Sequence, residues 1–106
     1  LITENEIHKQ GIASALRRIP DGRKYVISLD VDGLDASICP AVSHPEPGGL
    51  NFHEANDLLT GLARQGTIAG LIVAELVPEH DVHGLGGHTL SRLVVNLLYA
   101  LATRGP

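Results

Sequence analysis

Residues 24–32, Lys-Tyr-Val-Ile-Ser-Leu-Asp-Val-Asp, decide how the fold is interpreted. The nearly unbroken apolar run predicts a strand over 24–30, buried on both faces of a parallel sheet. Asp30 and Asp32 stand at the carboxyl end of this strand, where open parallel sheets bind their ligands. If the extended backbone continues through them, their side chains share one face and can converge on a cation. Carboxylate oxygens suit a hard cation such as manganese or magnesium.

The rest of the chain alternates helices with a second strand. Capping residues and hydrophobic periodicity predict four further elements: a helix over 4–18, a helix opened by Asn51 and Glu54 and ended at Gly66, a strand over 68–76, and a helix over 89–103. A helix between two apolar strands forms a βαβ unit, so the strands should be parallel. Glu75, at the end of the second strand, is therefore expected at the same sheet edge as Asp30 and Asp32.

Composition limits the class of protein. The chain has 106 residues, a formal net charge of −4 and scattered basic residues, which argues against nucleic-acid and anionic-membrane partners. Its one cysteine, Cys39, excludes an internal disulfide, and no apolar stretch reaches the roughly 20 residues of a membrane span. We expect a soluble cytoplasmic protein. Two strands leave long unpaired edges, and the chain begins at Leu1 without Met, so a longer parent chain is the favoured explanation.

Three general interpretations of the aspartate pair can be compared. The two acids could simply cap a turn. A calcium loop of the EF-hand type counted from Asp30 would need Gly and Glu where Asp35 and Ala41 stand, so that interpretation fails. A haloacid-dehalogenase-like phosphatase would use Asp30 as nucleophile and Asp32 as acid/base, but it also needs a downstream lysine. Both lysines of this chain lie upstream, which disfavours the phosphatase.

A longer pattern is more specific than the aspartate pair. It consists of Ser28 to Asp32, then Ala36, Pro40-Ala41 and Gly49 at fixed spacing. This pattern resembles the metal-binding signature of the ureohydrolases, the family of arginase and agmatinase, and every defining position is filled. Glu75 also falls where the family carries a glutamate in a similar Glu-Val-Asn-Pro segment, so the resemblance covers residues 24–103.

The resemblance implies a three-layer α/β/α sandwich with a parallel sheet, of which this chain supplies two strands and three helices. It implies a site for two manganese ions in the complete enzyme, with Asp30 bridging both and Asp32 binding one. Glu75 would hold the guanidinium of a small cationic substrate, agmatine-like or arginine-like, which is hydrolysed to urea and an amine. His44 stands where the family commonly has a threonine near the substrate. Relatives commonly form trimers or hexamers, so a homo-oligomer is expected.

The other metal ligands of the family, a Gly-Gly-His-like segment and an Asp-x-His-x-Asp segment, should lie upstream of the signature and have no counterpart here. We therefore interpret residues 1–106 as the C-terminal portion of a single ureohydrolase domain, inactive by itself. The alternative is a non-catalytic ureohydrolase-derived domain stabilised by oligomerisation. The segment Gly86-Gly87-His88 lies after the aspartates and opens a helix, so His88 is expected to be an ordinary helix-start residue.

The remaining histidines and the cysteine have simpler explanations than ligation. His80, Asp81 and His83 are expected to belong to a polar loop after the second strand. His53 is expected on a helix face, and Cys39 is expected to pack beside its proline neighbour.

Overall fold

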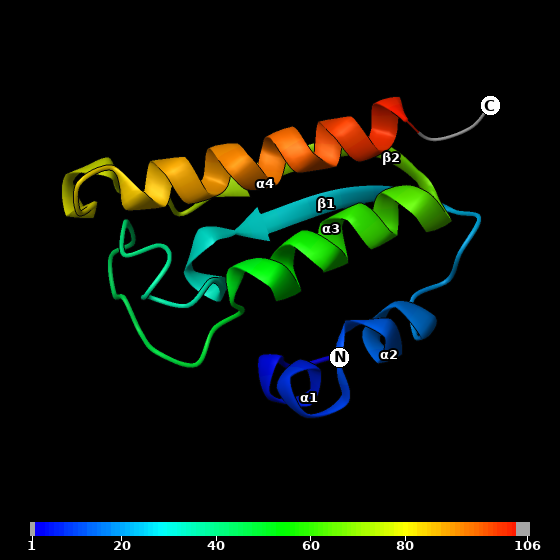
Figure 1. Cartoon of the computed structure of the whole chain (residues 1–106), viewed down its shortest axis with the longest axis horizontal. Coiled ribbons are helices and arrows are strands. Elements are labelled where there is room, and N and C mark those ends of the chain that lie inside the picture. The colour runs from blue at the N-terminus through cyan, green and yellow to red at the C-terminus, as the bar shows by residue number, and fades with distance from the viewer. Residues whose placement is uncertain (1, 104–106) are drawn as a thin grey trace.

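The computed structural model describes residues 2–103 and contains a two-stranded parallel sheet with helices (Figure 1). The elements in chain order are α1 (Glu4–Gln10), α2 (Ile12–Arg17), β1 (Lys24–Asp30), η1 (Val31–Gly33), α3 (Phe52–Gln65), β2 (Thr67–Ala74), η2 (Pro78–His80) and α4 (Leu85–Ala102). The predicted α/β class, the parallel pairing and the bounds of β1 are confirmed.

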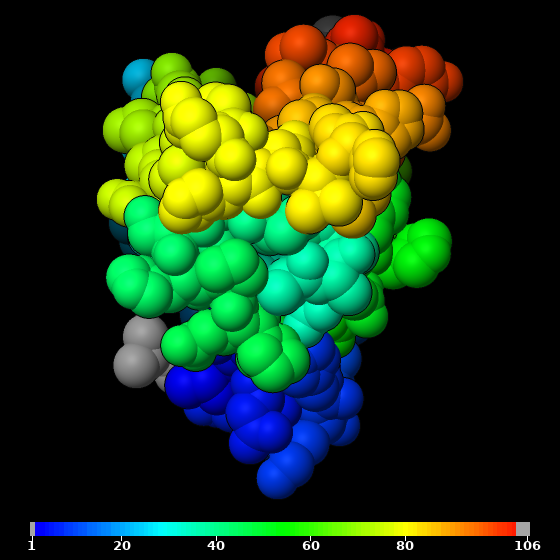
Figure 2. Space-filling model, turned by 90° about the vertical axis from the view of Figure 1, so that its left-hand side faces the viewer, coloured from blue at the N-terminus to red at the C-terminus, as the bar shows by residue number. Residues whose placement is uncertain are grey.

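The described helices cover one face of the sheet. Helices α3 and α4 pack on the face that presents Ile27 and Leu71, and Figure 2 shows the orange residues of α4 beside the yellow-green residues of β2. The opposite face leaves Val26 66% exposed and Ile72 55% exposed. The prediction that the strand at 24–30 is buried on both faces is therefore wrong for residues 2–103, because no described helix covers the second face. These residues supply the sheet and one helical layer of a sandwich.

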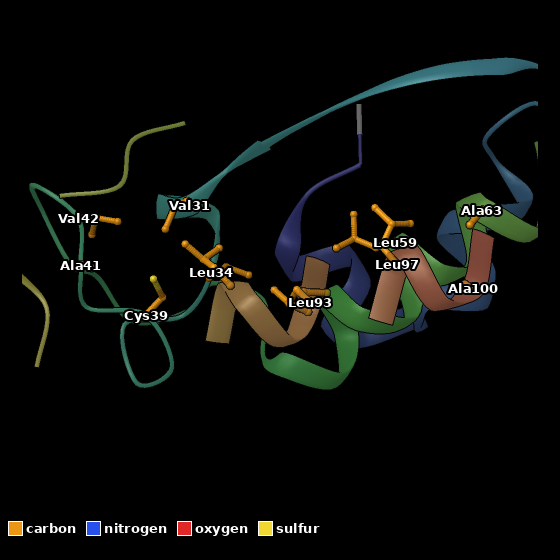
Figure 3. Packing of buried hydrophobic residues seen from close by; sticks show 12 residues of the cluster. Val31, Leu34, Cys39, Ala41, Val42, Leu59, Ala63, Leu93, Leu97 and Ala100 are labelled. Carbon is orange, nitrogen blue, oxygen red and sulfur yellow. The ribbon is translucent and has the colours of Figure 1, made fainter. Parts of the chain in front are cut away.

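The core lies between the sheet and the two long helices. Leu93 and Leu97 of α4 are almost fully buried and lie beside Leu59 and Ala63 of α3 (Figure 3). These side chains recur every three or four residues on one face of each helix, which is why the sequence pattern predicts them well. The cluster continues through Val31 into the loop after β1 and so connects the core to the carboxyl edge of the sheet.

Local chain chemistry explains where the helices begin and break. The capping box at the start of α3 is confirmed: the Asn51 side chain accepts from the Glu54 amide at 2.8 Å, and Glu54 accepts from the Asn51 amide at 3.0 Å. The predicted helix over 4–18 is interrupted, since Gly11 adopts φ 85°, outside the helical region, and separates α1 from α2. The last helix begins at Leu85 rather than at residue 89.

A hydrogen-bonded histidine joins α1 to α3 and to the loop before α3. His8 Nδ1 lies 2.8 Å from Glu54 Oε2 in α3, and His8 Nε2 lies 3.3 Å from the carbonyl oxygen of Gly48. Both partners are acceptors, so the arrangement is complete only when both ring nitrogens carry protons. The hydrogen bond to Glu54, followed by that to Gly48, raises the pKa of His8 above its usual value of 6.5.

This contact predicts a pH-dependent docking of α1. A raised pKa in the folded state adds stability that is complete below pH 6.5 and is lost as the pH rises through the folded-state value. We expect the amides of α1 to exchange hydrogen faster at pH 8.5 than at pH 6, after correction for intrinsic exchange. In His8→Gln, the exchange rates of the α1 amides, divided by their intrinsic rates, should be the same at pH 8.5 and at pH 6. If these corrected rates were also independent of pH in the wild-type protein, the contact of His8 would not be what holds α1.

Candidate functional site

Asp30 and Asp32 lie on a turn rather than on a continued strand. β1 ends at Asp30, and residues 31–33 form the short helix η1. The Asp30 side chain faces the start of this turn, with Oδ1 3.4 Å from the Asp32 amide. The condition for the expected same-face placement, an extended backbone through both residues, is therefore not met, because a local side-chain contact turns the chain after Asp30. Both aspartates are exposed at the carboxyl end of β1.

The turn nevertheless brings the two carboxyl groups together. The pKa of Asp32 is raised, first by a hydrogen bond between its carboxyl group and that of Asp30, and further by desolvation and the negative charges of Asp30 and Glu75. The three acids thus lie within electrostatic reach at one edge of the sheet. Crowded carboxylates of like charge are a donor set that a hard divalent cation would stabilise.

Two aspartates do not make a complete metal site. Within residues 2–103 there is no group of three or more His, Cys, Asp or Glu side chains placed to hold a metal ion. Asp30 and Asp32 therefore fit a hard divalent cation in the kind of ligand they supply, as two members of a larger ligand set. A metal ion held there would need further ligands from outside the described residues.

Glu75 lies where the parallel register places it. Asp30 of β1 pairs with Ala74 of β2, so Glu75 follows directly at the same edge as the aspartates, as the sequence predicts. Its backbone adopts φ 71°, in the left-handed region, which ends β2 at Ala74 instead of residue 76. A non-glycine residue there carries strain of about 1–2 kcal/mol, and such strain clusters at functional sites. The conformation projects an exposed carboxylate from the end of the strand.

The strain at Glu75 predicts an unusual order of stability. Glu75→Gly removes the side chain and relieves the left-handed strain, whereas Glu75→Ala removes the carboxylate but keeps the strain. We expect Glu75→Gly to exceed Glu75→Ala in unfolding free energy by about 1 kcal/mol, measured by urea denaturation. The same pair of substitutions at Glu79, where the backbone does not adopt a positive φ, should favour alanine. Equal stability of the two Glu75 variants would contradict the strain argument.

Asp35 organises the long loop between η1 and α3. Its carboxylate accepts from the Ser37 amide at 3.0 Å, from the Ser37 hydroxyl, and from the Gly48 amide at 2.8 Å. The Ser37 hydroxyl contact is the first cause of a lowered pKa of Asp35. A parallel bridge between Leu34 and Leu50 closes the base of the loop. Asp35 therefore links the start and the end of this proline- and glycine-rich segment through its hydrogen bonds.

Gly49 stands at the tightest point of the same loop. A Cβ atom there would lie 2.6 Å from the Leu34 carbonyl carbon, 2.7 Å from the Asp35 nitrogen and 2.7 Å from the Gly33 carbonyl oxygen. All three are backbone atoms and cannot move aside as a flexible side chain could. This close approach gives a physical reason for glycine at the last position of the signature.

His44 is exposed on this loop, and its side chain makes no hydrogen bond or ion pair within residues 2–103. The stretch before it is anchored near Glu75, because the Val77 amide donates to the Ala41 carbonyl at 2.7 Å. The structure therefore brings the His44 segment to the same end of the sheet as Glu75.

The polar loop after β2 caps the start of α4, a role that the sequence interpretation missed. Asp81 accepts from the Gly86 amide at 2.7 Å, the Gly87 amide at 3.1 Å and the Val82 amide at 2.9 Å. These bonds lower the pKa of Asp81 and explain why α4 begins four residues early. An aspartate shortly before Gly86-Gly87 was the available sequence signal. His80 hydrogen-bonds elsewhere, so His80, Asp81 and His83 form no common site.

The structure also places the remaining single residues. His88 lies in the first turn of α4 and is exposed, as predicted for a helix-start residue. His53 lies on α3 in edge contact with the ring of Phe52. Cys39 is 0% exposed, and burial raises the pKa of its thiol. Figure 3 shows Cys39 near Ala41 and Val42 in the part of the core that underlies the loop.

Comparison with known proteins gives consistent matches. A family model described as the Arginase family matches residues 1–103. The N(1)-aminopropylagmatine ureohydrolase of Thermus thermophilus is 36% identical over 85 residues, which are 78% of this chain and 28% of that protein. The mitochondrial arginase of Medicago truncatula is 43% identical over 82 residues, 76% of this chain and 24% of that protein.

A crystal structure of Trypanosoma cruzi formiminoglutamase with Mn2+ has a similar fold. The match has a TM-score of 0.83 at 27% identity and covers 95% of this chain and 35% of that one. The chain therefore spans only a quarter to about a third of the length of these proteins. No helix within residues 2–103 is long and apolar enough to cross a membrane.

Proposed function

Because the chain belongs to the arginase family, we propose that the complete protein hydrolyses a guanidino compound to urea and an amine. The observation that carries this proposal is the convergence of Asp30, Asp32 and Glu75 at one edge of the parallel sheet. The names of the similar proteins, an aminopropylagmatine ureohydrolase and an arginase, favour agmatine-like or arginine-like substrates. We further propose that the protein is a homo-oligomer and takes no nucleic-acid or membrane partner.

Manganese is the metal that we propose for this site. Asp30 and Asp32 would supply two of its carboxylate ligands, and the related formiminoglutamase was crystallised with Mn2+. Two bound ions, as we propose for the complete enzyme, would lower the pKa of a water and supply the nucleophile. The aspartates would offset the charge of the ions and would hold them at the sheet edge. Their exposure in residues 2–103 leaves room for further ligands from the rest of the protein.

Glu75 and His44 are proposed to act on the substrate. A carboxylate hydrogen-bonds a guanidinium through two parallel N–H donors, and the left-handed backbone of Glu75 projects its carboxylate near the aspartates. This arrangement would place the guanidinium carbon beside the metal-binding edge. His44, exposed on the adjoining loop, would lie near another part of the substrate and influence which guanidino compound is accepted.

The proposal is tested by measuring urea release by the complete protein from arginine, agmatine and guanidinobutyrate, with and without added manganese. We expect manganese-dependent urea release from at least one of the three. An absence of urea with all of them would reject the hydrolase function. The substrate with the highest kcat/KM would then identify the preferred guanidino compound.

A second candidate is a non-catalytic, ureohydrolase-derived domain that keeps the fold and is stabilised by oligomerisation. It is favoured by the small number of ligands, since residues 2–103 supply two aspartates and no complete metal site. The two candidates differ in metal binding: an enzyme should bind manganese stoichiometrically and lose that binding when Asp30 is replaced. A non-catalytic domain should form oligomers but bind no manganese stoichiometrically.

A further inference from the structure

One hydrogen bond near the candidate site has no part in the proposed catalytic arrangement. His80 ends η2, and its Nδ1 lies 2.8 Å from the carbonyl oxygen of Val42, 38 positions earlier in the chain. A carbonyl oxygen only accepts hydrogen bonds, so Nδ1 must carry the proton. His80 therefore donates to the backbone two residues before His44.

The segment before His44 is anchored from several directions. The Val77 amide donates to the Ala41 carbonyl at 2.7 Å. Ala41 is fully buried, and a Cβ atom on Gly86 would lie 2.9 Å from its Cβ, so α4 packs closely against it. Val42 is 3% exposed. The anchored stretch ends at Val42, whose carbonyl is the last group before His44 to be held by another element.

The residues around His44 are much less constrained. Ser43, His44 and Pro45 are exposed and make no hydrogen bond within the described residues. The next anchor is the Glu46 carbonyl, which accepts from the Ala36 amide at 3.2 Å. His44 thus lies in the middle of a short span fixed at both ends. Without the His80 hydrogen bond, the hydrogen-bonded anchoring of this end by another element would stop at Ala41, which the Val77 amide holds.

We propose that His80 is a positioning residue for substrate recognition, which fixes the Val42 end of this span and so sets where His44 lies relative to Glu75. The role of His44 rests on the proposed function, whereas the His80 hydrogen bond rests on geometry alone. His80 does not touch the substrate or the metal ligands in this arrangement. It acts through the backbone of Val42.

The donor position gives a set of matched variants. His80→Asn places an amide N–H₂ close to the position of Nδ1, His80→Gln places it close to that of Nε2, and His80→Leu has no donor. In the complete protein we expect KM for agmatine or arginine to rise about three- to tenfold in the Leu and Gln variants, with a smaller change in kcat. His80→Asn should keep KM close to the wild-type value. Manganese affinity should be the same in all four proteins.

A double-mutant cycle tests whether His80 acts through His44. In a His44→Ala background, His80→Leu should raise KM no further. The proposal would be overturned if His80→Asn were as impaired as His80→Leu, if the effect of His80→Leu persisted in full without His44, or if kcat fell as much as kcat/KM.

A spectroscopic measurement separates this inference from the proposed function. Nitrogen chemical shifts of the His80 ring should report the tautomer protonated at Nδ1, and His80→Leu should accelerate hydrogen exchange at the amides of Val42 and Val77, which donate to the carbonyls of Pro40 and Ala41. If the complete protein releases no urea, the hydrolase proposal fails while this measurement still decides the role of His80. An Nε2-protonated neutral ring, or unchanged exchange in His80→Leu, would disprove the positioning role.

Discussion

Asp30→Asn should lower kcat/KM for urea release by about 100- to 1000-fold in the complete protein. The substitution keeps the shape of the side chain and an oxygen that can face the Asp32 amide, but it removes the negative charge. Manganese affinity should fall in parallel, measured by the electron paramagnetic resonance of free Mn2+. Because the carboxylate of Asp30 repels that of Asp32, the stability of the metal-free protein should stay the same or rise.

Asp57→Asn is the matched control. Asp57 lies exposed on α3, away from the sheet edge, and the substitution makes the same change in net charge. Its activity and manganese affinity should remain within a factor of two of wild type, as is usual for surface substitutions. Equal losses in both variants would indicate a general charge effect. Full activity of Asp30→Asn would remove Asp30 from the ligand set.

Gly49→Ala should destabilise the fold by at least about 2–3 kcal/mol, even though it adds only one methyl group. The new Cβ would lie 2.6–2.7 Å from three backbone atoms of residues 33–35, so the main chain itself must shift. Since the free energy of unfolding of a small domain is about 5–15 kcal/mol, this is a large fraction of the total. Urea denaturation of the complete protein, followed by circular dichroism, measures the change.

Gly33→Ala provides the control in the same loop region. A Cβ atom at Gly33 would have nothing within 4 Å, and the backbone there does not adopt a positive φ. We expect a change of less than about 0.5 kcal/mol. Comparable destabilisation by the two substitutions would show that the close approach at Gly49 is not the cause.

The sequence predicted those features that depend on neighbouring residues. The bounds of β1, the capping box of α3 and the placement of Glu75 beside the aspartates were all correct, because apolar runs, capping pairs and parallel register are local or follow from one crossover. The signature also includes a glycine at position 49. The reason why glycine is needed there, the close approach of the backbone of residues 33–35, became visible only in the structure.

Some of the features that the sequence did not predict depend on distant partners. His80 bonds to Val42 across 38 positions, and His8 bonds to Glu54 across 46. No local pattern marks such pairs. The early start of α4 required knowing that Asp81 folds back on the helix, and the break at Gly11 required knowing its backbone angle. The burial expected on the second face of the sheet needs a covering layer that residues 2–103 do not supply.

The buried thiol of Cys39 gives the loop a native reporter. It is the one cysteine of the chain, it is 0% exposed, and its sulfur lies only 3.0 Å from where a Cβ on Gly86 would stand. A thiol reagent can therefore react only when the loop separates from the start of α4. The labelling rate of Cys39 in the native protein would measure how often the segment that carries His44 opens, without an engineered cysteine.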